Sequence, residues 1–161
     1  MPDEHPIPVR DKARADQAWV DRLLTERWGG RAVLLRGGLV DAGALPALIA
    51  GDRLGLATFM LSGDAAELVT LDAVQPSRGI GTALVEALWA RLGARAGRRL
   101  RVMTTNDNLE ALRFYQRRGF HLVGLRPGAI ERGRGLKPSI PRLGCHGIPI
   151  RDEIELERAA P

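Results

Sequence analysis

Residues 67–95 constrain the fold more than any other segment, because a strand pattern passes through a glycine turn directly into a helix pattern. The run ELVTLDAV, residues 67–74, is β-branched and apolar enough for a central strand, and Pro76 ends it. From Thr82 onward, apolar residues recur along one stripe of a helix. A strand that turns straight into a helix predicts a second, parallel strand after that helix.

The following residues complete this α/β order. LRVMTT, residues 100–105, is the expected parallel strand, and a second helix pattern runs from Asn108 and ends at Gly119. Asp107 and Glu110 have the spacing of a capping box, which predicts that this helix begins at Asp107. DEIELER, residues 152–158, is expected to be the last strand.

The first third of the chain reads as one helix and several strands. Apolar residues at helical spacing predict an amphipathic helix over residues 14–28, and the glycines that follow stop it. Residues 31–61 contain short strand patterns separated by turn signals, for which a meander is the simplest arrangement. Together with the later elements, this order predicts a mixed α/β fold with a parallel central strand pair and helices packed on the faces of the sheet.

Length and composition predict a cytoplasmic protein of one domain over residues 1–161, with residues 1–6 as a tail. The N-terminus has acids and prolines where a secretory signal would need a basic start and an apolar stretch, and the apolar runs are too short to cross a bilayer. We expect no metal site, because Cys145 is the only cysteine and the three histidines are scattered. The net charge of +5 suits a phosphorylated ligand or nucleic acid.

The glycine turn itself indicates a phosphate site. A helix that begins at such a turn points free backbone N–H groups at one spot, and its dipole favours negative charge. Gly79 and Gly81 would let the backbone approach a ligand and adopt positive φ. The turn is neither a Walker loop nor a GxGxxG fingerprint, since Leu84 occupies the third glycine position. A tight strand-to-helix turn without a ligand is the alternative interpretation.

Two blocks resemble one enzyme family. RGIGTAL after a strand is similar to motif A of the GNAT acetyltransferases, and NLEALRFYQRRGF is similar to their motif B, in the same order. The resemblance spans residues 67–120 and implies a three-layer α-β-α GNAT fold. In that fold the sheet is mostly antiparallel, partly splayed, and parallel at the central pair. The implied activity is transfer of an acetyl group from acetyl-CoA, as co-substrate, to a primary amine.

The resemblance also implies where acetyl-CoA would bind. The pantetheine arm would lie where the first central strand splays from the second, along the strand end, and the pyrophosphate would lie on the glycine turn. Asn108 occupies the motif B asparagine, whose other role is a polar residue in the first turn of a helix. The implied cofactor-binding residues are Leu71, Ala73, Val74, Ser77, Arg78, Gly79, Ile80, Gly81, Thr82 and Asn108.

One position departs from the family pattern. The family has glutamine or arginine three residues before the first glycine, where this chain has Pro76, with Gln75 one place early. Proline lacks a backbone N–H, so one pyrophosphate donor is lost there. The charged side chain of Arg78 would add a contact of its own.

Acyl transfer to an amine needs a base for the amine and an acid for the departing thiolate. Tyr115, the only tyrosine, occupies the motif B position where the family often keeps the acid, and its alternative role is a core aromatic. Asp72 and Glu67 are the base candidates on the strand beside the cleft, and a regular strand would point them to opposite faces. Asp72 is nearer the expected reaction centre, and an ordered water is the alternative relay.

The acceptor remains open to several interpretations. We expect a small-molecule or peptide amine, with residues 127–149, a long excursion rich in glycine, proline and arginine, folding over the acceptor site. The arginines of motif B read as a charged helix face. A CoA-binding regulator without turnover and a basic nucleic-acid-binding protein are the rival functions, and the 4% aromatic content disfavours the second. Final strands in the family often pair across dimers, which makes a homodimer an expectation.

Overall fold

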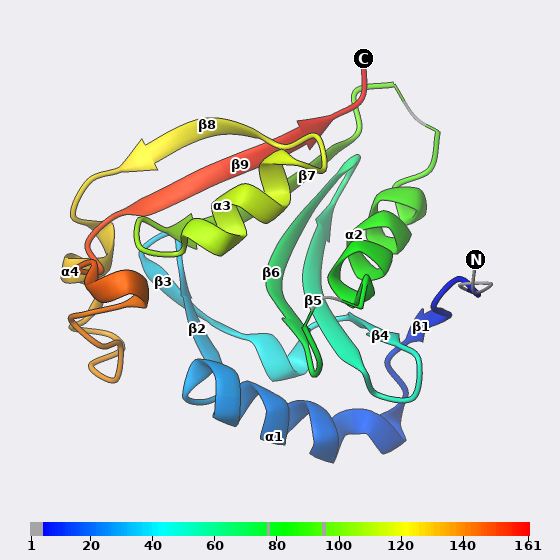
Figure 1. The fold of residues 1–161 in the computed structure, drawn as a ribbon, viewed down its shortest axis with the longest axis horizontal. Helices are drawn as coiled ribbons and strands as arrows, with labels where there is room; N and C mark the ends of the chain where they lie inside the picture. Colours follow the sequence, from blue (N-terminus) through cyan, green and yellow to red (C-terminus); the bar gives the residue numbers. More distant parts are fainter. Residues whose placement is uncertain (1–4, 77, 95) are drawn as a thin grey trace.

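A sheet in the order β1-β4-β5-β6-β7-β9-β8 forms the centre of the computed structural model, which describes residues 5–76, 78–94 and 96–161 (Figure 1). Neighbouring strands run antiparallel except β6 and β7, which run parallel. This arrangement confirms the expected mixed α/β class. The strands are β1 (Val9–Asp11), β4 (Ala47–Ala50), β5 (Gly55–Ser62), β6 (Ala65–Ala73), β7 (Arg99–Thr105), β8 (His121–Arg126) and β9 (Glu153–Ala159).

The two parallel strands separate after a short paired region. Residues 65–68 of β6 pair with residues 99–102 of β7, and the ladder stops there. Residues 69–73 of β6 continue along β5, while β7 continues along β9 as far as Thr105. The backbone groups of β6 that face this gap therefore have no strand partner on that side. The expected splay of the central sheet is confirmed.

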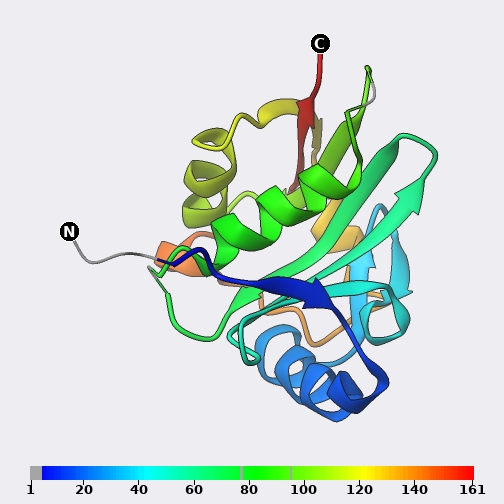
Figure 2. The same cartoon turned by 90° about the vertical axis from the view of Figure 1, so that its right-hand side faces the viewer.

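Helices cover both faces of the sheet, as expected. α2 (Ile80–Arg91) and α3 (Leu109–Gln116) lie on one face and α1 (Gln17–Trp28) lies on the other (Figure 2). Each face has its own apolar cluster of buried residues. The first, under α2 and α3, includes Phe59, Leu68, Leu84, Leu88, Leu100, Phe120 and Leu156, and the second, under α1, includes Val20, Leu24, Val33, Leu35, Ile49, Leu56 and Val69.

The region expected to form a meander instead contains a separate hairpin. β2 (Ala32–Leu35) pairs with β3 (Gly38–Asp41) in a two-stranded sheet of their own, and only β4, β5 and β6 form a meander. The reason is the turn between β2 and β3, where Arg36 and Gly37 both have positive φ, at 51° and 80°. A two-residue turn of this kind matches the twist of a hairpin, so β2 pairs with the next residues in the chain.

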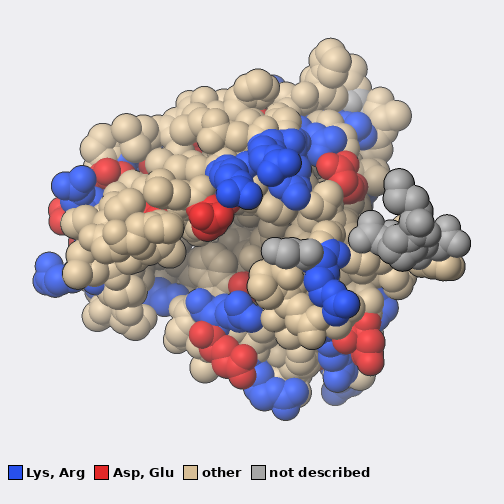
Figure 3. Space-filling view, in the orientation of Figure 1, with Lys and Arg blue, Asp and Glu red and all other residues tan. Residues whose placement is uncertain are grey.

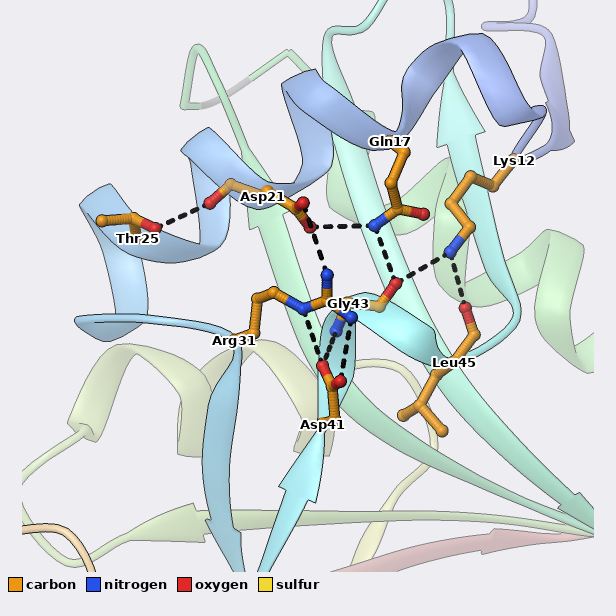
Figure 4. A network of polar contacts seen from close by, with 8 residues as sticks. All are labelled: Lys12, Gln17, Asp21, Thr25, Arg31, Asp41, Gly43 and Leu45. Carbon is orange, nitrogen blue, oxygen red and sulfur yellow. Dashed lines mark hydrogen bonds and ion pairs between the residues drawn. The ribbon is translucent and has the colours of Figure 1, made fainter.

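A polar network holds α1 against the 3₁₀ turn Ala42–Ala44 that follows this hairpin (Figure 4). The carbonyl oxygen of Gly43 accepts hydrogen bonds from Nζ of Lys12 at 3.1 Å and from Nε2 of Gln17 at 2.9 Å. Arg31 pairs with Asp41 across the base of the hairpin, with Nη2 2.8 Å from Oδ2. These contacts set the position of α1, and therefore of the residues at its C-terminal end.

A β-bulge in β6 reverses one expectation about the base candidates. Thr58 pairs with Thr70 and Phe59 with Leu68, so Val69 is an extra residue in β6. The extra residue shifts the alternation of side chains by one. Glu67 and Asp72 consequently face the same side, that of α1, and the expectation of opposite faces was wrong because the strand is not regular. Arg36 binds Glu67 at 3.0 Å, and Trp28 of α1 binds Asp72.

The excursion at residues 127–149 contains the short helix α4 (Ala129–Gly133) and the 3₁₀ turn Cys145–Gly147, and is otherwise irregular. It is tied to β7 and α1 by polar contacts. Nδ2 of Asn106 donates to the carbonyl oxygen of Pro149 at 2.9 Å, and Nζ of Lys137 donates to that of Trp28 at 2.7 Å. Within the described ranges, no helix combines the length and apolarity needed to cross a membrane.

Candidate active site

A cavity of about 440 Å³ opens between the end of β6, the start of α2 and one side of α3. Figure 3 shows a hollow beside α3, with lysine and arginine side chains gathered at its rim. The cavity therefore lies at the place where the glycine turn and the splay predicted a cofactor. Its wall is formed by Leu71, Ala73, Gln75, Gly79, Ile80, Gly81, Thr82, Glu110, Ala111, Arg113, Phe114, Tyr115, Arg117 and Arg118.

The first turn of α2 forms one end of this cavity. Gly79 precedes the helix with a φ of +72°, in the left-handed region, and a Cβ added there would meet nothing within 4 Å. Its carbonyl oxygen accepts from the amide of Ala83 at 2.9 Å, which is the first bond of the helix. The amides between these two residues, from Ile80 to Thr82, have no partner within the helix. They line the cavity at the positive end of the helix dipole, with no acceptor among the described residues.

Gly81 has a different role from the one that its sequence suggested. It lies inside α2 without a positive φ, and a Cβ there would lie 3.2 Å from Cζ of Phe114. The absence of a side chain at Gly81 therefore lets α3 pack closely against the start of α2. Only Gly79 uses the conformational freedom expected of both glycines.

Arginines in α3 and directly after it line the same cavity. Arg118 reaches back to α2, with Nε 2.9 Å and Nη2 2.6 Å from Oγ1 of Thr82, and its guanidinium stacks on the Phe114 ring at 3.7 Å. Burial, and next the nearby charge of Arg117, lower the pKa of Arg118. The sequence pattern predicted only a charged helix face for Arg113, Arg117 and Arg118 and missed this placement. Their position on the helix next to the glycine turn was the available signal.

The other expected cofactor residues fall into distinct positions. Leu71 and Ala73 line the cavity from β6. The amide of Val74 already donates to the carbonyl oxygen of Leu54 at 2.8 Å, and its exposed side chain is not part of the cavity wall. Arg78 binds Oε1 of Gln75 at 2.6 Å. Ser77 lies outside the described residues.

Asn108 caps α3 and does not line the cavity beside α2. Its Oδ1 accepts from the amide of Ala111 at 3.1 Å, so Asn108 is the N-cap, and the expected capping box at Asp107 was wrong. Asp107 instead binds the hydroxyl of Thr105 at 2.5 Å and the amide of Cys145 at 2.9 Å, which ties the 127–149 excursion to β7. One local and one tertiary contact thus occupy the carboxylate that the sequence assigned to the helix end.

Tyr115 lies in the wall of the cavity, between the core and the open space. Its side chain is 6% exposed and packs edge-on against Phe114 and Phe120, with ring centroids 5.1 Å and 5.2 Å away. Burial, reinforced by the negative charge of Asp72 and opposed by Arg118, raises the pKa of Tyr115 well above its ordinary value. The phenol is therefore a proton donor and not a phenolate at neutral pH.

Asp72 faces the other side of β6, towards the end of α1. Its Oδ2 accepts a hydrogen bond from Nε1 of Trp28 at 2.9 Å. Burial raises the pKa of Asp72, and the Trp28 bond and the charge of Arg27 partly offset this. Asp72 and Tyr115 are close enough to interact electrostatically. The side chain of Asp72 lies on the α1 side of β6, whereas Tyr115 of α3 lies on the other side of that strand.

A second hollow lies on the α1 side of the splay, in two neighbouring parts of about 110 Å³ and 320 Å³. Both parts are lined by Trp28, Val33, Leu34, Thr105 and Ile130. The smaller part reaches into the gap between β6 and β7, and the larger part is covered by the 127–149 excursion. The structure thus has one cavity on each side of the splay. The larger part is closed by Lys137, Ser139, Ile140, Pro141 and Ile150.

The described residues contain no cluster of three or more histidine, cysteine, aspartate or glutamate side chains arranged to hold a metal ion. Cys145 is exposed and lies in the 3₁₀ turn of the excursion, outside the walls of both cavities.

Comparison with known proteins assigns the chain to a family. The acetyltransferase (GNAT) domain family matches residues 45–122. The uncharacterized protein YxbD of Bacillus subtilis (strain 168) is 37% identical over 141 residues, which cover 85% of this chain and 89% of YxbD. This chain belongs to the GNAT acetyltransferase family.

Solved structures share the fold at low sequence identity. Arabidopsis thaliana NAA60 in complex with acetyl-CoA superimposes with a TM-score of 0.66 at 15% identity, over 95% of this chain and 99% of that chain. The ribosomal-protein-S18-alanine N-acetyltransferase of Escherichia coli superimposes with a TM-score of 0.63 at 16% identity, over 94% of this chain and 92% of that chain. The GNAT fold implied by the two sequence motifs is therefore confirmed.

Proposed function

We propose that this protein is an N-acetyltransferase that moves an acetyl group from acetyl-CoA to a primary amine of a small molecule or peptide, by direct transfer in a ternary complex. The observation that carries the proposal is the cavity where the free amides of the α2 first turn and three arginines meet beside Tyr115. Family membership and the acetyl-CoA bound to the NAA60 structure support the choice of cofactor.

The residues of the cavity fit acetyl-CoA. A Cβ built on Gly79 would meet no atom within 4 Å, so there is space for a ligand beside its backbone. The backbone amides from Ile80 to Thr82 are suited to donate hydrogen bonds to phosphate oxygens. Arg117 and Arg118 add positive charge at the same end, where bidentate contacts to phosphate are favourable. Leu71 and Ala73 provide an apolar strip along β6 towards the splay. When bound, the cofactor would supply the acetyl group as a thioester.

Tyr115 and Asp72 are our candidates for the proton transfers. The phenol of Tyr115 holds its proton at neutral pH, as an ordinary tyrosine does, and can deliver it to a departing thiolate; burial raises its pKa and makes it a weaker acid than an exposed tyrosine. Asp72, on the other face of the splay, has a raised pKa that makes its carboxylate a better proton acceptor than an ordinary aspartate. An acid on one side and a base on the other suit a reaction that takes place in the gap between the strands.

Direct transfer is favoured over an acyl-enzyme route through cysteine. The single cysteine of the sequence, Cys145, is exposed and lies outside the wall of the cavity beside Tyr115. The acceptor would instead enter from the α1 side, where the 127–149 excursion covers the second hollow. Among the relatives in structure, the Escherichia coli enzyme acts on an alanine of ribosomal protein S18, which is consistent with an amine acceptor here.

Calorimetry and turnover together test the proposal. Acetyl-CoA should bind with a sub-millimolar dissociation constant, and a panel of amines should yield acetylated products by mass spectrometry. Failure to bind acetyl-CoA or CoA would remove the cofactor from the proposal. Binding without any acetylated product would favour the CoA-binding regulator, and a salt-sensitive gel shift without CoA binding would favour the nucleic-acid-binding protein.

The homodimer and the cytoplasmic location stay predictions. β8 forms one edge of the sheet, and its side chains Leu122, Val123 and Leu125 are each more than half exposed, at 53%, 54% and 61%. Light scattering of the purified protein would determine the oligomeric state, and substitution of Leu125 by glutamate should shift a dimer that uses this edge towards the monomer.

A further inference from the structure

A buried carboxylate oxygen on the α1 side of the splay has no hydrogen-bond partner among the described residues. Glu153 is the first residue of β9 and is 3% exposed. Its Oε2 accepts from the amide of Arg36 at 3.3 Å, whereas Oε1 accepts no hydrogen bond. Nη1 of Arg126 lies 3.7 Å from Oε1, which is an ion pair at a distance beyond hydrogen bonding. A buried carboxylate oxygen without a donor is costly, so this atom is suited to a donor brought by a ligand.

Glu153 lines the smaller part of the second hollow, where β6 and β7 separate. Val69 of β6 and Thr105 of β7 form the two sides of this space. Two other polar groups of this wall are engaged elsewhere, because the hydroxyl of Thr105 donates to Asp107 and Oδ1 of Asn108 caps α3. Of the described residues in this wall, Glu153 alone carries a carboxylate. A cation that enters the gap between the strands therefore meets this one carboxylate, whose Oε1 also forms the 3.7 Å ion pair with Arg126.

The neighbouring larger part of the hollow has a different character. Its wall is mostly apolar, including Trp28, Val33, Leu34, Ile130, Ile140 and Ile150. Its charged residues are Arg27 and Lys137, both positive. Nζ of Lys137 donates to the carbonyl oxygens of Trp28 and Ala32, at 2.7 Å and 2.6 Å, which holds this charge at the pocket. An apolar group fits this part of the hollow, and a second cation would be repelled from it.

We propose that Glu153 binds the ammonium group of the acceptor, and that the acceptor is a monoamine with an apolar body. The proposal rests on the proposed acetyltransferase function and names its substrate class. Oε1 of Glu153 accepts a charge-assisted hydrogen bond from the ammonium, and the apolar body occupies the larger part of the hollow. The ammonium must lose a proton before the amine reacts, and Asp72 remains the candidate base that accepts it. Trp28, which donates a hydrogen bond to Asp72, belongs to the same wall.

Paired variants and acceptors test this assignment. Glu153→Gln keeps the shape of the side chain and removes its charge, and Glu157→Gln is the matched control. Glu157 lies on the same strand, pairs with Arg101 at 2.9 Å and lines neither part of the hollow. With phenethylamine as the acceptor, we expect Glu153→Gln to raise the amine KM about tenfold or more, because a charge-assisted bond is lost. The acetyl-CoA KM should stay within about twofold in both variants.

Two further measurements do not depend on turnover by the variant. Calorimetric titration of phenethylamine into the CoA-loaded protein should show weaker binding in Glu153→Gln than in Glu157→Gln. In the wild-type protein, phenethylamine and hexylamine should have higher kcat/KM than diaminobutane, which carries a second cation. This comparison holds even if Glu153→Gln fails to fold.

The contrary outcomes are distinct. Equal KM values for the amine in the two variants would overturn the role of Glu153, and a wild-type preference for the diamine would overturn the substrate class. A protein that binds acetyl-CoA and acetylates only other kinds of amine would overturn the substrate class and leave the proposed function standing. A protein that does not bind acetyl-CoA would remove the proposed function, and this proposal with it.

Discussion

Nε1 of Trp28, the last residue of α1, donates a hydrogen bond to Oδ2 of Asp72 near the end of β6, over 2.9 Å. The two residues are 44 positions apart in the sequence, and the bond joins the helix on one face of the sheet to the splayed strand. Trp28 also lines both parts of the second hollow. The same indole therefore lines the pocket and lowers the pKa of the candidate base, against the larger upward effect of burial.

Trp28→Phe should shift the acid limb of the pH–rate profile to higher pH. Burial raises the pKa of Asp72 and the Trp28 hydrogen bond lowers it. Loss of the bond should therefore raise the pKa of Asp72 further. The measurement is kcat against pH at saturating amine and acetyl-CoA. Trp19→Phe is the control, because Trp19 lies on the same helix and packs against the same apolar cluster. An unchanged acid limb in Trp28→Phe would exclude Asp72 as the group that titrates.

Tyr115→Phe should lower kcat by about a hundredfold or more while acetyl-CoA affinity changes little, since general acid catalysis typically contributes that much. The ring contacts with Phe114 and Phe120 survive the substitution, so the fold should be retained. An ordinary tyrosine has a pKa of 10.0, and burial raises the pKa of Tyr115 above that value. The wild-type rate should therefore not fall through ionisation of Tyr115 at any pH up to 10. Steady-state kinetics and calorimetry are the measurements, and an unchanged kcat would leave Tyr115 a packing residue.

Arg118→Ala should weaken acetyl-CoA binding by about tenfold or more and leave kcat at saturation nearly unchanged. The substitution removes positive charge from the cavity and the two contacts to Thr82 that orient the first turn of α2. Calorimetry at low and high salt is the measurement, and the difference between wild type and variant should shrink as salt screens the charge. Arg142→Ala is the control, because Arg142 is exposed and lies outside the cavity wall. Equal losses in both variants would indicate a general charge effect.

Thr58 and Thr70 form a buried pair of hydroxyl groups next to the bulge in β6. Their hydroxyl oxygens are 2.7 Å apart and the residues are 0% and 1% exposed. Thr70→Val should reduce the free energy of unfolding by about 1–3 kcal/mol, because it leaves the Thr58 hydroxyl buried without a partner. The double variant with Thr58→Val should cost less than the sum of the two single variants. Urea unfolding measures all three, and strict additivity would mean that the hydroxyl pair contributes nothing.

Much of the fold and part of the candidate site were predictable because their signals are local. The β-branched run before Pro76, the glycine turn and the stripe on α2 lie within one stretch of chain, and they place a helix start beside a strand end. Gly79 was identified because a left-handed residue before a helix is a property of that residue and its neighbours. The order of elements then implied the parallel pair of β6 and β7.

The sequence by itself determined the order of the central elements, the family and the position of the glycine turn, since each depends on residues close together in the chain. Only the tertiary structure decided that Glu67 and Asp72 share a face, that Asp107 binds the excursion, and that Glu153 borders the second hollow. These outcomes depend on a bulge, on loop contacts and on a strand that pairs with β7 from about fifty residues away. Such contacts bring distant residues together by packing, which no spacing within the chain encodes.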